Sequence, residues 1–184
     1  RRFWQVIAIT AIFTLARFSE AFLILRAQSV GLAVAYVPLV LVVMNVTYAA
    51  GAYPAGALSN AKDRYTLLSW SLVPLIVADL LLASATGLTN TFAGIALWGL
   101  HLALSQGLLS ALVADTAPEN FRGTAFGIFS LVNGLALLAA SLIAGAMWDA
   151  AGPGATFLTG AVLACGALVG LYLSRRRDEA VPRI

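Results

Sequence analysis

TFAGIALWGLHLALSQGLLSALVA, which occupies residues 91–114, contains no Asp, Glu, Lys or Arg. A helix needs about 20 consecutive apolar residues to cross the hydrocarbon core of a bilayer. Surface helices of soluble proteins instead alternate an apolar stripe with a polar face. The stretch therefore predicts a transmembrane helix.

The rest of the chain has the same character. Of its 184 residues 61% are hydrophobic and 10% are charged, and the mean hydropathy is +0.92. Soluble domains carry about 25% charged residues, so this chain cannot cover a water-facing surface. The net charge of +3 does not indicate nucleic-acid binding, because the basic residues gather at the ends of apolar segments.

Six apolar segments of spanning length are separated by short polar connections. They cover residues 3–26, 34–58, 66–86, 91–114, 124–147 and 154–174. Residues 175–184 form a polar tail. The sequence thus predicts an all-α membrane protein with six transmembrane helices and no soluble domain.

Lys and Arg are distributed unevenly over the two sides that six spans define. One side holds nine of the eleven basic residues, and the other two lie within the first span. The nine are Arg1, Arg2, Lys62, Arg64, Arg122, Arg175, Arg176, Arg177 and Arg183. Cytoplasmic loops are enriched in such residues, so both termini are expected in the cytoplasm.

The second and fifth spans end on similar strings. Residues 55–60 read AGALSN and residues 144–149 read AGAMWD. Each span is the middle one of a group of three, and successive groups of three helices have opposite orientations. The echo is compatible with a 3+3 inverted repeat, which many transporters contain, and with coincidence in an Ala-rich chain.

The connection after the second span reads GALSNAKDRY, residues 56–65. It resembles the loop motif of the major facilitator superfamily, Gly-x-Leu-x-Asp-Arg-x-Gly-Arg-Arg. Gly56, Leu58 and Arg64 match, whereas Asn60 replaces an Asp and Asp63 replaces a Gly. These two departures predict a weaker charge network around the loop.

Two further stretches resemble the same superfamily. Residues 118–127 look like its connection into helix eleven, and residues 145–152 look like the end of that helix. The resemblance covers almost the whole chain and corresponds to the C-terminal six-helix half of a twelve-helix fold. It implies an N-terminal half outside this chain, a lipid bilayer around it and a small-molecule substrate.

Polar side chains near the middle of a span are costly and are often functional. They are Arg17, Glu20, Asn45, His101, Gln106 and Asn133, and the resemblance implies that their helices line a central cavity. We expect them to form a substrate or proton pathway. The alternative is structural, with Arg17 and Glu20 as an i, i+3 ion pair on one helical face and the amides as bridges between helices.

Glu20 is the first candidate proton carrier, because a carboxyl group withdrawn from water favours its neutral form. His101 is the second, because histidine titrates near neutral pH. Asp79 lies in an outer span of the fold that the resemblance implies. It is expected to be structural, either paired with Arg26 or hydrogen-bonded locally. Cys165, alone in its apolar run, is expected to be a packed and inert thiol.

Charged residues at the cytoplasmic ends of the spans are expected to form a latch that breaks on opening, with a solvated loop as the alternative. The acidic and basic members are Asp115, Glu119 and Arg122 on one connection and Lys62, Asp63 and Arg64 on the other.

No motif supports catalysis, a cofactor or a metal site. His101 is the only histidine, and neither a Gly-x-Ser-x-Gly sequence nor a phosphate-binding loop is present. The sequence favours an inner-membrane transporter that moves a small solute by alternating access, with proton coupling. The alternative is a membrane scaffold or subunit that transports nothing.

Overall fold

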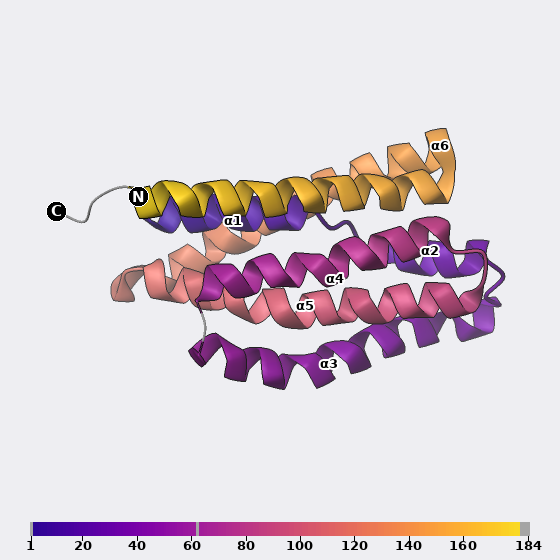
Figure 1. Ribbon diagram of the computed structural model, residues 1–184, viewed down its shortest axis with the longest axis horizontal. Coiled ribbons are helices and arrows are strands. Elements are labelled where there is room, and N and C mark those ends of the chain that lie inside the picture. The colour runs from indigo at the N-terminus through magenta and orange to yellow at the C-terminus, as the bar shows by residue number, and fades with distance from the viewer. Residues whose placement is uncertain (1, 62, 181–184) are drawn as a thin grey trace.

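The computed structural model describes residues 2–61 and 63–180, with side chains described for 3–58 and 63–172. This part of the chain is helical, with turns between the helices (Figure 1). The elements are α1 (Arg2–Leu15), α2 (Ala21–Ser29), the 3-10 turn η1 (Val34–Tyr36), α3 (Val37–Ala61), α4 (Arg64–Ser84), α5 (Leu88–Thr116), the 3-10 turn η2 (Glu119–Phe121) and α6 (Arg122–Ala180).

By length and hydropathy, four helices of the described residues are able to cross a membrane. They correspond to α3, α4, α5 and α6, and the shorter apolar helix Phe3–Leu15 adds to them. The membrane character that the composition predicts is therefore confirmed.

The first predicted segment is divided into two helices. The backbone leaves the helical conformation between Leu15 and Ala21, and α2 begins after this break. Arg17 and Glu20 lie within the break, so the shared helical face that the sequence predicts for them does not exist. A serine hydroxyl that bonds to nearby backbone favours such non-helical geometry, and Ser19 Oγ accepts from the amide of Ala21 at 3.3 Å.

The two last predicted segments are joined within α6. Gly152 has φ 83°, and this non-helical residue separates two helical halves. Only glycine adopts such a φ readily, and Pro153 fits the first turn of the following half. Thr156 Oγ1 donates to the carbonyl of Ala144 at 3.2 Å, which ties the two halves together across the reversal.

The connections alternate between the two ends of the bundle (Figure 1). The start of α1, the α3–α4 connection, the α5–α6 connection and the end of α6 lie at one end. The α2–α3 and α4–α5 connections and the reversal at Gly152 lie at the other. Arg64 and Arg122 therefore stand at the same end, as the distribution of basic residues predicts.

Helix α5 lies at the centre of the packing, in contact with α1, α3 and α4. Its closest approach is to α3, where a Cβ at Gly99 would overlap Thr47 Oγ1 and the backbone carbonyl of Met44. One turn along α3, a Cβ at Gly51 would lie 2.9 Å from the Cβ of Ala103. Helices in lipid associate through such small residues because their backbones can approach closely.

Helix α4 is held between α5 and the second half of α6 by glycines on both sides. A Cβ at Gly94 of α5 would lie 2.7 Å from Leu82 Cγ, and one at Gly154 of α6 would lie 3.1 Å from the carbonyl oxygen of Ala83. The end of α4 is thus enclosed by two backbones that approach without side chains.

Arg26 of α2 caps the end of α4. Its guanidinium donates to the carbonyl oxygens of Leu82 at 2.7 Å, Ala83 at 3.3 Å and Ala85 at 2.8 Å. These carbonyls belong to the last turn of a helix, which lacks intrahelical donors and carries partial negative charge. The predicted pair of Arg26 with Asp79 is wrong, because the guanidinium is used by these carbonyls.

The contact at Gly99 predicts a stability difference between two glycines of one helix. Gly99→Ala should lower stability by about 1–3 kcal/mol, the usual cost of overpacking. Gly107→Ala is the matched control, since nothing lies within 4 Å of a Cβ there, and it should be neutral or stabilising. Thermal unfolding in detergent measures both. Equal midpoints would contradict the tight α3–α5 contact.

The cap at Arg26 predicts a second difference. Arg26→Leu should cost at least about 2 kcal/mol, because it leaves buried carbonyls without donors. Arg64→Gln, which removes an exposed ion pair, should cost no more than about 1 kcal/mol. A larger loss of thermal stability for Arg64→Gln than for Arg26→Leu would contradict the assignment of the cap.

Candidate functional site

A pocket of about 130 Å³ lies beside the break in the first segment. Four of the six residues predicted for the pathway line it, namely Arg17, His101, Gln106 and Asn133. They come from the break, from α5 and from the first half of α6. The remaining lining residues are Phe13, Thr14, Ser105, Leu109, Ser110 and Phe129.

The break brings Arg17 to the pocket. Just after Arg17, Phe18 is buried among aromatic rings, with centroids 5.3 Å from Trp98 and 5.3 Å from Phe157. The amide of Ser19 donates to Ser141 Oγ of α6 at 3.1 Å. Non-helical backbone at membrane depth persists only where protein or a polar cavity surrounds it, and the break has both.

His101 is buried and held in one orientation. Its Nδ1 lies 2.7 Å from the carbonyl oxygen of Ser71 in α4, and its ring stacks on Phe13 at a centroid distance of 6.5 Å. A carbonyl oxygen only accepts, so Nδ1 carries the proton. Nε2 is then the ring nitrogen available as an acceptor.

Asn133 connects the pocket walls. Its Oδ1 accepts from Thr14 Oγ1 at 2.5 Å, which joins α6 to α1. Bridging helices is the structural role that the sequence leaves open for the amides. Asn133 nevertheless also lines the pocket, so the two roles are combined at this position.

Glu20 and Asn45 do not line this pocket. Glu20 stands at the N-cap position of α2, and it forms no ion pair with Arg17 in the described structure. The ion pair that the sequence leaves open as the structural alternative is therefore absent, because the break separates residues that a continuous helix would align. Asn45 is exposed on α3 and donates from Nδ2 to the carbonyl of Leu41 at 2.8 Å.

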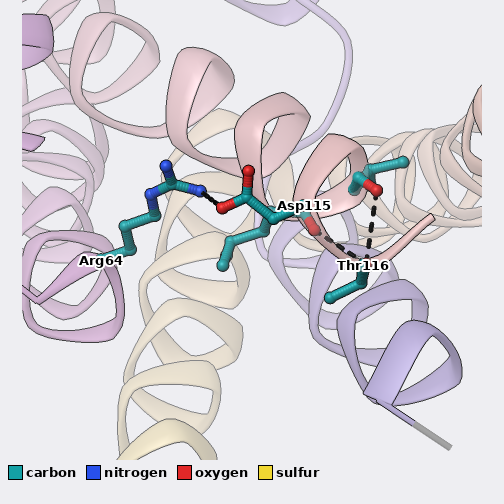
Figure 2. Close-up of polar contacts among 5 residues, drawn as sticks. Arg64, Asp115 and Thr116 are labelled. Carbon is teal, nitrogen blue, oxygen red and sulfur yellow. Dashed lines mark hydrogen bonds and ion pairs between the residues drawn. The ribbon is translucent and has the colours of Figure 1, made fainter. Parts of the chain in front are cut away.

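One contact of the expected latch is present (Figure 2). Arg64 Nη1 pairs with Asp115 Oδ2, joining the start of α4 to the end of α5. Asp115 is 59% exposed and Arg64 is 32% exposed. A pair so open to solvent contributes little stability.

The other residues expected around the latch lie outside this pair. Asp63 caps α4, where Oδ2 accepts from the amide of Thr66 at 3.2 Å. Gly56 is exposed in the last turns of α3, and Glu119 and Arg122 are exposed at the α5–α6 connection. Two members, Lys62 and the side chain of Asn60, lie outside the described residues.

Sequence reasoning missed the hydroxyl groups of the pocket. Ser105 and Ser110 stand four residues after His101 and Gln106, and Thr14 stands three residues before Arg17. Helical spacing places such residues on one face, so the signal was present. Serine and threonine are common in transmembrane helices, so their spacing from the predicted pathway residues was weak evidence for a pocket.

The pocket offers hydrogen-bond donors, hydrogen-bond acceptors and one positive charge. Guanidinium, amide and hydroxyl groups line it, and none of its lining residues is acidic. In the part of the chain that the structure describes, no three His, Cys, Asp or Glu side chains are placed to hold a metal ion. The lining chemistry suits a small polar solute with acceptor oxygens.

Comparisons with known proteins agree with this architecture. Residues 6–183 match the Major Facilitator Superfamily. The chain is 38% identical over 164 residues to an uncharacterised MFS-type transporter of Methanocaldococcus jannaschii, covering 86% of this chain and 41% of the relative. It is 29% identical over 150 residues to uncharacterised proteins of Mycobacterium bovis and Mycobacterium tuberculosis, covering 80% of this chain and 36% of each relative.

The chain thus spans about two fifths of the length of the curated relatives that it matches. The superfamily consists of transporters, not of enzymes. With the family match over nearly all of its residues and its long apolar helices, the chain belongs to the major facilitator superfamily.

Proposed function

We propose that this chain is the C-terminal six-helix half of a secondary transporter that moves a small polar solute by alternating access. In this proposal α1 and α2 together make one crossing, α3, α4 and α5 make one each, and α6 makes two around Gly152. The crossings form two groups of three with opposite orientation. The greater length of the relatives supports a second half outside this chain.

The pocket beside the break is the observation that carries the proposal. Substrate sites of transporters are typically built at discontinuous helices near the middle of the membrane. Here the discontinuity at Arg17 coincides with a pocket lined by side chains from three helical segments. Polar groups are expensive to place within the membrane and are usually functional there, which favours a transporter over a scaffold.

Proton coupling is the second part of the proposal. Glu20 is a carboxyl group within the break, and His101, whose Nε2 is the acceptor nitrogen, lines the pocket. Asn45 of α3 adds a polar side chain to the proposed pathway, on the surface that would face the second half. The Arg64–Asp115 pair supports a cytoplasmic latch, because it joins two helix ends and is exposed enough to open.

The orientation follows from charge. Arg64 and Arg122 lie at the end of the bundle where α1 begins, and basic residues favour the cytoplasmic side. We place both ends of the chain in the cytoplasm and the protein in the inner membrane.

Alternating access predicts that a pocket residue is reached by water from both sides of the membrane. The test uses Gln106→Cys in the full-length protein, with Cys165→Ser because Cys165 is exposed and not packed as the sequence suggests. A membrane-impermeant methanethiosulfonate reagent is added to right-side-out vesicles and, separately, to inverted vesicles. We expect the thiol introduced by Gln106→Cys to react in both.

Leu102→Cys is the matched control. Leu102 is one turn away on α5 and 3% exposed, and it does not line the pocket. The thiol introduced there should react from neither side. Reaction of the Gln106→Cys variant from one side only would replace alternating access with a fixed vestibule. Protection from both sides would indicate a closed centre and favour the scaffold alternative.

A further inference from the structure

Asp79 is a buried carboxyl group that the proposed pathway does not use. It lies in α4, within a helix long and apolar enough to cross the membrane. Its exposure is 0%, and neither carboxyl oxygen has a hydrogen-bond partner among the described residues. The local hydrogen bond that the sequence suggests is therefore absent, as is the pair with Arg26.

The carboxyl group meets the break of the first segment at one point. A Cβ at Gly160 of α6 would lie 2.7 Å from Asp79 Oδ2 and 2.9 Å from Phe18 Cε1. The glycine thus leaves room for a carboxylate and an aromatic ring on the same patch of backbone. Phe18 is the residue of the break that lies beside this site.

A second buried polar atom adjoins the same ring. Trp98 lies 5.3 Å from Phe18 between ring centroids, and its Nε1 is buried without a partner among the described residues. Indole Nε1 is a donor only, and an ionised carboxyl group is an acceptor only. Phe18 therefore lies beside two residues with unsatisfied polar atoms, the donor Trp98 and the acceptor Asp79.

The charged and titratable side chains of the neighbouring elements do not neutralise Asp79. Arg26 of α2 is bound to the last carbonyls of α4, and His101 of α5 is bound to Ser71. Arg17 lies one residue before Phe18 and Glu20 two residues after it, and within the described structure neither forms an ion pair with Asp79. On the side of α6 the carboxyl group faces Gly160, which carries no side chain.

An ionised carboxylate without a donor or a counter-charge is strongly disfavoured in such surroundings. The neutral acid fits them. Release of the proton requires water or a hydrogen-bond donor to reach the carboxyl group of Asp79. Phe18 of the break lies beside that group and would have to move. The Trp98 indole is a donor of suitable chemistry once that ring moves.

We propose that Asp79 is a proton-binding site. Its carboxyl group is protonated in this conformation, and it releases the proton when Phe18 and the break move. The step is an acid–base exchange in which the carboxylate takes one proton from a hydronium ion, leaving water, and later returns the proton to water. Its use in coupling rests on the proposed transport function, but the occupancy of the site does not. The protonation can therefore be tested without a substrate.

Infrared spectroscopy of the full-length protein in lipid nanodiscs at pH 7 tests the proposal. A water-exposed aspartate is about 0.1% protonated at this pH, so a mostly protonated Asp79 represents a change of roughly several hundredfold. We expect a carboxylic-acid C=O band that disappears in Asp79→Asn and persists in Glu20→Gln. Aspartate labelled with ¹³C at the carboxyl carbon should shift the band, which assigns it to an aspartate, and Asp79→Glu should make the band insensitive to that label, which assigns it to position 79 even if Asp79→Asn folds poorly.

Phe18→Ala tests the link to the break, with Phe22→Ala as its control. Phe22 packs on Phe18 at 5.2 Å but is not among the atoms that meet Gly160. In Phe18→Ala the acid band should be weaker at pH 7 and should return when the pH is lowered. In Phe22→Ala the band should keep its wild-type intensity at pH 7. If Asp79 gives only carboxylate bands in the wild-type protein at pH 7, the proposal that it binds a proton is wrong. An unchanged band in Phe18→Ala would overturn the gating by Phe18.

Discussion

The hydrogen-bonding demand of backbone in hydrocarbon governs this structure. Each N–H and C=O group within a membrane needs a partner in the protein or access to a polar cavity. The long helices meet the demand through their own turns, and the segment between Leu15 and Ala21 does not. Its neighbours make the break tolerable, with Ser141 accepting from the Ser19 amide and the pocket adjoining Arg17.

Several features that look separate follow from that break. Phe18 can enter the aromatic cluster with Trp98 and Phe157 only because the chain leaves the helix there. Arg17 lines the pocket from the same turn. Gly160 lets α6 approach Phe18 of the break without a side chain in between. The polar pocket and the buried carboxyl group at Asp79 thus both adjoin one interruption in the backbone.

The sequence predicted the membrane character, the family and four of the pocket residues, because length, hydropathy and charge distribution are carried by many residues at once. It failed at Arg17 and Glu20, where helical spacing implied a shared face. The break depends on partners far along the chain, such as Ser141 for Ser19. The role of Arg26 was missed for the same reason, since the carbonyls that it caps lie on another helix.

Hydrogen exchange at the break tests this account most directly. The amides of Phe18 and Glu20 have no hydrogen-bond acceptor among the described residues. In the full-length protein in nanodiscs, a peptide covering residues 16–20 should exchange at least about tenfold faster than peptides from the middle of α4 and α5. Protection equal to that of those helices would mean that the first segment is continuous, and the break, its pocket and the placement of Arg17 would have to be abandoned.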